Sequence, residues 1–430
     1  MLSTQVSTWL DRRKIHFGWV VVSVVFLTTL VSSAALGMPG ALLQPLSREF
    51  HWSTEQISSA LAVRFVLYGL MGPFSAVLLE WLGVKKIVCS ALVLIGLGMA
   101  LATGITALWQ LVVLWGIMLG VGSGMTALVL ATVISNRWFE KRRGLVVGML
   151  TASSATGQLI FLPLEAWLIE TFGWRSAVFP VFVACLAVAG LAFAFLRDRP
   201  EDLGMSAYGA PRPSGNAVPA AIRRRSLLEP FRVLAQASRN LNFWLLFGTF
   251  FVCGLSTNGL IQTHFISLCG DFGLAPVPAA SVLAMMGAFD FFGTITSGYL
   301  SDRFDNRKLL FWYYGLRGLS LFWLPHSNFT LYGLSIFALF YGLDWVATVP
   351  PTVKLTTQTF GKENGGMVFG WVFAGHQLGA AVAAYGAGMS RTFLLTYSPA
   401  LYAAGAACLL AAGVTFAIRR PARLPQIVTS

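Results

Sequence analysis

Four charged residues stand inside long apolar stretches of the sequence: Arg64, Asp290, Arg317 and Asp344. A charge within a membrane span costs about 2.5–3.5 kcal/mol on insertion scales, so each one needs a role. A guanidinium can hold a carboxylate through two parallel hydrogen bonds. A carboxylic acid in apolar surroundings can carry a proton. These residue types suit the binding of a small organic anion together with a proton or a counter-anion.

The composition places these apolar stretches in a lipid bilayer. Of the 430 residues, 56% are hydrophobic and 11% are charged, which is about half the charge of a soluble protein. We therefore expect an all-α polytopic membrane protein with twelve transmembrane helices. The apolar runs predict spans near 17–43, 55–79, 87–105, 109–136, 143–169, 174–196, 241–268, 277–301, 308–325, 330–353, 364–390 and 398–418.

The distribution of basic residues predicts the orientation. With the N-terminus in the cytoplasm, 25 of the 30 Lys and Arg fall in cytoplasmic segments and three fall outside. The positive-inside rule then puts both termini in the cytoplasm. The basic clusters alternate with apolar runs instead of forming one face, which argues against a nucleic-acid partner. The five Cys have no paired spacing, so neither a disulfide framework nor a zinc site is indicated, and no cofactor is expected.

The two halves of the chain repeat at an offset of 222 residues. This register predicts six-helix bundles at 1–196 and 241–430, a cytoplasmic linker at 197–240 and a central cavity between the bundles. The glycine matches suggest close helix contacts. The matches include Glu80 with Asp302, Lys85 with Arg307, Lys86 with Lys308, and Gly144, Gly148 and Gly157 with Gly366, Gly370 and Gly379.

The loop after the eighth span resembles the signature loop of the major facilitator superfamily. It runs from Gly298 through Asp302 and Arg303 to Arg307 and Lys308. Its counterpart in the first half has Ala76 and Trp81 where the signature has Gly and Arg. In such a gating loop the acid can cap a neighbouring helix N-terminus and pair with a basic residue across the half, as a latch for the outward-open state. Simple anchoring of positive charge is the alternative. The gating residues expected are Glu80, Lys85, Lys86, Asp302, Arg303, Arg307 and Lys308.

Two further motifs resemble the monocarboxylate-porter branch and its bacterial relatives, which include oxalate/formate-type antiporters. They are Phe17-Gly18-Trp19 at the first span and the run from Trp138 to Gly148 before the fifth. In that branch an acid at the position of Asp290 is followed four residues later by Arg, and the pair serves proton and carboxylate. Here the later residue is Thr294, which leaves the counter-charge unassigned.

Arg64 is the replacement that we predict for this counter-charge. The repeat register sets Arg64 against Met286 and Tyr68 against Asp290, one turn apart in both helices, so all four should face the cavity. Arg64 would then hold the carboxylate, and Asp290 would carry the proton. The alternative is that Arg64 and Asp290 only pair with each other.

The remaining polar residues of the spans form a second group. Arg317 and Asp344 lie at similar depth and are expected to form an ion pair, although Asp344 is also a candidate for proton coupling. Pro350 and Pro351 should break the tenth span. Glu165 lies near the outer end of its span and can simply be solvated. Residues expected to complete the substrate site are Tyr68, Asn258, Gln262, His376 and Gln377.

Together these features predict a secondary active transporter, not an enzyme, that works as a monomer by alternating access. The expected substrate is a small organic anion, first a monocarboxylate, moved by proton symport or anion exchange. An exporter of drugs or other metabolites on the same fold is the alternative. The sequence leaves the direction of transport open.

Overall fold

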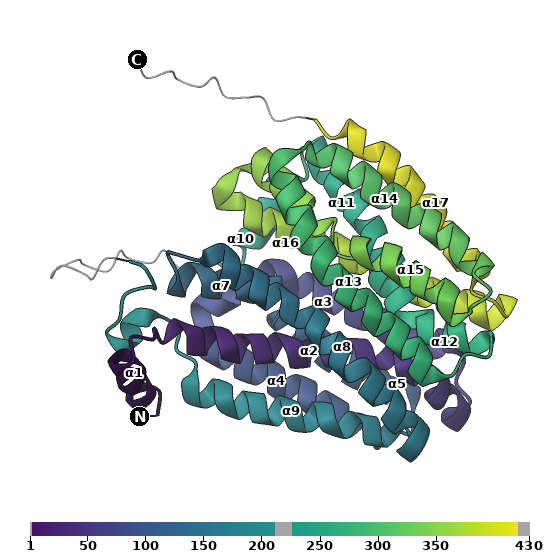
Figure 1. Cartoon of the computed structure of the whole chain (residues 1–430), viewed down its shortest axis with the longest axis horizontal. Coiled ribbons are helices and arrows are strands. Elements are labelled where there is room, and N and C mark those ends of the chain that lie inside the picture. Colours follow the sequence, from purple (N-terminus) through teal and green to yellow (C-terminus); the bar gives the residue numbers. More distant parts are fainter. Residues whose placement is uncertain (1, 211–225, 420–430) are drawn as a thin grey trace.

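A computed structural model describes residues 2–210 and 226–419 of the chain (Figure 1). The part of the predicted linker at 211–225 and the tail at 420–430 lie outside the described residues. The described part is almost entirely helical, as the apolar runs predict.

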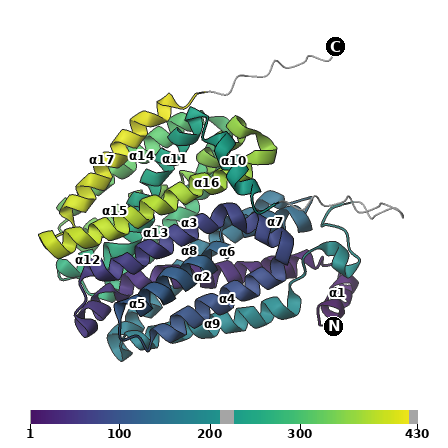
Figure 2. The ribbon, with the colours of Figure 1, turned by 180° about the vertical axis from the view of Figure 1, so that it is seen from behind.

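The helices run back and forth along one common direction in both views (Figures 1 and 2). Within the described residues, eleven segments are long and apolar enough to cross a membrane. Helix α14 falls short of that standard because it carries Arg307, Lys308 and Arg317, but it packs against α15 and α17 and supplies the remaining span. The helices are α1 (Leu2–Arg12), α2 (Gly18–Phe50), α3 (Thr54–Leu82), α4 (Val84–Ala102), α5 to α6 (Leu108–Met125, with a π-helical stretch), α7 (Leu128–Trp138), α8 (Arg143–Phe172), α9 (Trp174–Phe195), α10 (Glu229–Ala237), α11 (Leu241–Gly254), η3 (Leu255–Gln262), α12 (Thr263–Asp271), α13 (Pro276–Arg303), α14 (Asn306–Trp323), α15 (Leu331–Asp344), α16 (Val349–Leu394) and α17 (Ser398–Val414).

Two of these helices differ from simple spans. Helix α16 contains Gly361 with a φ of 80°, which ends the tenth span and starts the eleventh at Asn364. The tenth span is itself interrupted between α15 and α16, at residues 345–348. The predicted break is therefore present and lies just before Pro350 and Pro351. Prolines are tolerated in a first helical turn because the amide groups there have no helical partner.

Connections at one end of the bundle carry most of the positive charge, and we call this end the basic side. It includes the loops at 139–142 and 304–305 and the residues Lys85 and Lys86. The opposite end, with the loops at 51–53, 173, 272–275 and 395–397, is called the far side.

The first and last six spans meet along three helix pairs. Helix α3 packs along α16, α8 along α13, and α2 against α12 (Figure 2). At the far side, the Gln44 amide donates to the carbonyl oxygen of Ser267 at 3.3 Å, and the Tyr385 hydroxyl donates to Glu55 at 2.6 Å. A Cβ atom on Gly40 would lie 2.7 Å from the carbonyl oxygen of Gln262. The two halves are thus closed against each other on the far side.

Only some of the repeated glycines serve close helix contact. A Cβ atom on Gly157 or Gly379 would overlap a backbone carbonyl of the neighbouring helix. By contrast, Gly144, Gly148 and Gly366 have no other atoms within 4 Å of such a Cβ. The expectation of tight packing is therefore wrong for these three glycines, because they border an open space on the basic side.

Gly379 gives a stability test with a control on the same helix. Gly379→Ala should destabilise the protein by about 1–3 kcal/mol, because the added methyl overlaps the carbonyl of Phe251. Gly386 has open space around it, so Gly386→Ala should stabilise by up to about 1 kcal/mol through helix propensity. Thermal unfolding in detergent measures both changes. Equal melting temperatures for the two variants would contradict the packing.

Candidate functional site

A polar cavity of ≈ 190 Å³ lies between the two halves, and we call it the central cavity. It contains six of the residues predicted for the substrate or the proton. These come from α3, η3, α13 and α16: Tyr68, Asn258, Gln262, Asp290, His376 and Gln377. The structure thus brings this group together, whereas their binding of a substrate stays a prediction.

The first half contributes hydroxyl groups that the sequence prediction missed. The hydroxyls of Ser33 and Ser154 are 2.7 Å apart, and the Thr126 hydroxyl donates to Ser32 at 3.1 Å. Serine and threonine are common in membrane helices, so their types alone did not mark them. The hydroxyl and amide residues on this wall are Thr29, Ser32, Ser33, Ser123, Thr126, Thr151, Ser154 and Gln158.

The central cavity continues into a larger space of ≈ 870 Å³ on the basic side, the vestibule. Both spaces are lined by Thr151, Asp290 and Val346. The vestibule reaches Glu80, Asp302 and Lys354 near the helix ends. With the far side closed, the cavity is accessible from the basic side.

Arg64 does not line the central cavity, although Tyr68 one turn away does. Its side chain is 2% exposed and donates one hydrogen bond, from NH1 to the carbonyl oxygen of Leu36 at 3.0 Å. Leu36 itself lines the cavity. Met286 is also buried instead of facing the cavity. Of the four residues predicted to face the cavity, Tyr68 and Asp290 do so, whereas Arg64 and Met286 do not.

Arg64 and Asp290 do not pair with each other. Among the described residues no carboxylate bonds to Arg64, and its Nε has no partner. The guanidinium is therefore a buried charge, directly behind the cavity wall, without a counter-charge. Such a group is strongly unfavourable unless an anion reaches it.

Asp290 instead holds the interruption of the tenth span. Its Oδ1 accepts a hydrogen bond from the backbone amide of Val346 at 2.9 Å and another from the Thr294 hydroxyl at 3.0 Å. The residue that replaces the expected Arg thus orients the carboxylate. Protonation or ligand binding at Asp290 would therefore act directly on a hydrogen bond to the backbone of the interrupted tenth span, which lines the cavity.

Arg317 and Asp344 form the predicted ion pair behind this interruption. The Arg317 Nε lies 2.6 Å from Asp344 Oδ2, and the two side chains are 0% and 6% exposed. Another guanidinium nitrogen donates to the backbone carbonyls of Asp344 and Trp345 at 2.6 and 3.2 Å. The pair satisfies the carbonyl end of α15, and Asp344 does not line the central cavity.

The two histidines of the spans have different surroundings. His376 lines the cavity and stacks on Phe373, with ring centroids 5.8 Å apart. His264 is buried away from the cavity, where its Nε2 bonds to the carbonyl oxygen of Ala384 at 2.8 Å.

The loop acid Asp302 pairs within its own half. The Lys354 ammonium lies 2.7 Å from Asp302 and also donates to the carbonyl oxygen of Ser301 at 2.8 Å. The cap of α14 is Asp305 instead, whose carboxylate accepts from the Arg307 amide at 3.1 Å. The expected cap at Asp302 is therefore wrong, because Asp305 is the residue that directly precedes α14.

Two of the other basic loop residues lie over aromatic rings. The Lys85 ammonium lies 4.0 Å from the ring centre of Phe193, and Arg303 lies 4.1 Å from that of Tyr299. These contacts fit the anchoring alternative as well as gating.

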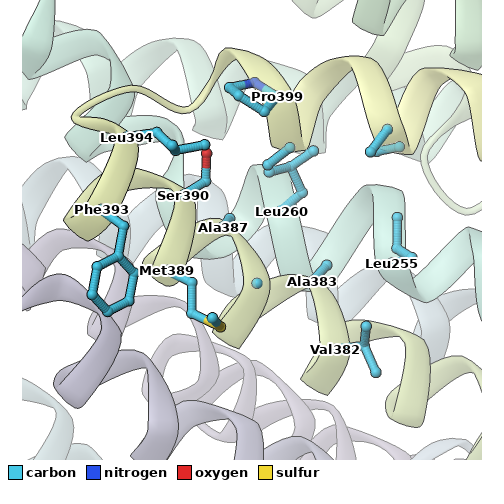
Figure 3. Close-up of a pocket in the computed structure, with 14 residues that line it drawn as sticks. Leu255, Leu260, Val382, Ala383, Ala387, Met389, Ser390, Phe393, Leu394 and Pro399 are labelled. Atoms are coloured by element: carbon cyan, nitrogen blue, oxygen red, sulfur yellow. The ribbon is translucent and has the colours of Figure 1, made fainter.

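A further pocket of ≈ 460 Å³ lies apart from the central cavity, between η3, α16 and α17 (Figure 3). Figure 3 shows apolar side chains such as Leu255, Leu260 and Pro399 on its walls. Its one hydroxyl, of Ser390, is engaged by the carbonyl oxygen of Thr396 at 2.7 Å. The pocket is lined mainly by apolar side chains.

The sequence model of the Major Facilitator Superfamily matches residues 25–384 and, separately, 271–428. The chain belongs to the major facilitator superfamily. Members of this superfamily are membrane transporters, so the protein is a transporter and not an enzyme.

Known relatives agree with the branch expected from the motifs. Monocarboxylate transporter 13 of Rattus norvegicus is 25% identical over 402 residues, covering 93% of this chain and 88% of its own. The uncharacterized MFS-type transporter YcxA of Bacillus subtilis (strain 168) is 23% identical over 379 residues, covering 86% and 88%. The crystal structure of the D-xylose-proton symporter superimposes with a TM-score of 0.71 at 14% identity, covering 94% of this chain and 98% of its own. This last likeness confirms the fold.

Loss of the Arg317–Asp344 pair should cost stability. Arg317→Met leaves the Asp344 carboxylate and two backbone carbonyls without their donor, with an expected loss of about 3–5 kcal/mol. Thermal unfolding of the purified transporter measures this loss. Arg175→Met, at a half-exposed pair with Glu49, is the control and should cost about 1 kcal/mol or less. A melting temperature for Arg317→Met equal to that of the control would contradict a structural role.

Proposed function

We propose that this transporter moves a small organic anion, a monocarboxylate first, together with a proton. Arg64 serves as the counter-charge for the carboxylate, and Asp290 takes up the proton. Tyr68, Asn258, Gln262, His376 and Gln377 recognise the rest of the substrate. Asp344 has no proton-coupling role in this proposal, because its charge is used by Arg317.

The unpaired guanidinium of Arg64 is the observation that carries the proposal. It is buried, it lacks an acid partner among the described residues, and it bonds to the carbonyl of a residue that lines the cavity. A small shift of the Leu36 and Tyr68 side chains would connect it to a substrate in the cavity. The similarity to monocarboxylate transporters supports a carboxylate as that substrate.

Asp290 suits the proton because it lies in the cavity and none of the described basic residues forms an ion pair with it. Its bonds come from a hydroxyl and a backbone amide, and both persist when the other carboxylate oxygen is protonated. The negative charge is therefore not fixed by an ion pair and can be neutralised as the cavity closes.

The proposal includes the cellular arrangement. The basic side faces the cytoplasm of a bacterial inner membrane, both termini are cytoplasmic, and the unit is a monomer. The bundles 1–196 and 241–430 rock about the linker 197–240, so the present cavity is open to the cytoplasm. Glu80, Lys85, Lys86, Asp302, Arg303, Arg307 and Lys308 act as gating residues in this motion.

Arg64→Gln should lower carboxylate uptake by about 100-fold, because a charged hydrogen-bond pair worth about 3 kcal/mol is lost. Uptake of labelled lactate, pyruvate or oxalate into proteoliposomes measures the change. Arg48→Gln, an exposed far-side arginine of the same half, is the control and should transport normally. Full uptake by the folded Arg64→Gln variant would exclude the assignment.

Asp290→Asn should separate exchange from proton-driven uptake. The amide oxygen can still accept from Val346 and Thr294, so the interrupted helix is preserved while the titrating group is lost. Exchange of labelled for unlabelled carboxylate should continue, and accumulation driven by an inward proton gradient should stop. Asp11→Asn, on the exposed face of α1, is the control. Retained gradient-driven accumulation in Asp290→Asn would contradict the role of Asp290.

An exporter of drugs or other metabolites is the second candidate, and one observation favours it. Within residues 2–210 and 226–419, no Lys or Arg directly lines the central cavity. Transport of a broad set of neutral or cationic compounds, independent of Arg64, would identify this function.

A further inference from the structure

Glu165 is a buried acid that the site described above does not use. Its side chain is 0% exposed, and neither carboxylate oxygen has a hydrogen-bond partner in the part of the chain that the structure describes. The sequence places Glu165 near the end of its span and suggests simple solvation. The structure shows the opposite, because helices of the second half cover this part of α8.

Glu165 lies between two spaces that water can reach. On α8 it shares a face with Ser154 and Gln158, which line the central cavity about two turns below. One turn above it, Ile169 lines a polar pocket of ≈ 660 Å³ on the far side. Glu165 therefore stands in the layer that separates the central cavity from the far side.

This layer is an apolar contact between the two halves. Leu162 and Ala166, on either side of Glu165 in the sequence, belong to a buried cluster with Ala41 of α2. The same cluster contains Phe265 of α12 and Leu283 of α13, which come from the second half. Closure of the far side thus places the Glu165 carboxyl in apolar surroundings.

Among residues 2–210 and 226–419, no charged group compensates Glu165 in this position. The titratable and charged groups on the helices that pack against α8, and on α8 itself, are engaged elsewhere or lie at its ends. On α8 itself, Glu170 accepts from the Val277 amide, and Arg143 lies at the opposite end. Helix α2 carries Arg48 on the far-side rim and Glu49, which pairs with Arg175 of α9. Helix α13 carries Asp290, which bonds to Val346, and Asp302 and Arg303 at its basic end. Helix α12 carries His264, which bonds to Ala384, and Asp271, which pairs with Arg391. Helix α7 carries Arg137 at the basic end.

We propose that Glu165 is a proton-binding site of the far-side closure, loaded from water on that side. An ionised carboxylate without a partner is too costly in this apolar layer, so the layer closes only over the neutral acid. The inference rests on the proposed proton-coupled transport and adds a second protonation site to it.

The proton balance of the step is simple. When the far side opens, α8 and α13 separate and water reaches Glu165, which releases one proton and becomes a carboxylate. To close again, the carboxylate takes one proton from far-side water and returns to the neutral acid. Alkaline far-side water therefore favours the open form, and acidic water favours the closed form.

Hydrogen–deuterium exchange on the full-length protein in nanodiscs tests this without any substrate. In the wild type, the far-side ends of α8 and α13 should lose protection from mildly acidic to mildly alkaline pH, after correction for intrinsic exchange. Glu165→Gln mimics the neutral acid, so its protection should stay high at both pH values. Glu165→Asp keeps a titrating group and should retain the pH response.

The control is Glu170→Gln on the exposed end of the same helix. Its amide oxygen can still accept from Val277, so its pH response should equal that of the wild type. A pH response in Glu165→Gln equal to that of the wild type would overturn the proposal, as would the absence of any response in the wild type. Failure of carboxylate uptake in the liposome assays would leave this exchange result intact, so the two proposals are tested separately.

Discussion

The structure depends on one constraint: within the bilayer, every charge and every free backbone group needs a partner. The interruption of the tenth span exposes carbonyls at the end of α15 and an amide at Val346. Arg317 donates to two of these carbonyls, and Asp290 accepts from the amide. The interruption is therefore stabilised from two neighbouring helices: α14 supplies a cationic donor for the free carbonyls, and α13 supplies an anionic acceptor for the free amide. A cavity lined by this irregular backbone is possible only because the two neighbours complete its hydrogen bonds.

The same constraint separates structural charges from functional ones. Arg317 and Asp344 neutralise each other as a buried ion pair. Arg64 has one hydrogen bond and no counter-charge, and Glu165 has no partner at all within the described structure. An uncompensated charge is costly in apolar surroundings. Arg64 is therefore stabilised by binding an anion, and Glu165 is stabilised by binding a proton. The proposed carboxylate substrate supplies the partner that Arg64 lacks, and the proton proposed for the far-side closure neutralises Glu165.

The sequence predicted a side chain's position correctly where that position depends only on the helix that carries it. The spans, the ion pair of Arg317 with Asp344, and the shared cavity of Tyr68 and Asp290 could all be predicted from apolar length, depth and the repeat register. The turn of Arg64 toward the carbonyl of Leu36 could not, because it depends on how α2 packs on α3. Glu165 was misjudged for a related reason. Distance from a helix end gives depth in the membrane, but the burial of Glu165 comes from helices of the other half.

The replacement of an expected Arg by Thr294 has a mechanical consequence if Arg64 holds the carboxylate. In the monocarboxylate-porter pattern, acid and base are four residues apart on one helix, so both move with one half. Here the acid is on α13 and the base is on α3, on opposite sides of the central cavity. A bound carboxylate at Arg64 and a proton at Asp290 then neutralise the two walls separately. Closure of the cavity brings those walls together. The electrostatic cost of burying the two charges is lowest when the carboxylate and the proton are both bound. Coupling of substrate to proton thereby follows from the division of the charges between the halves.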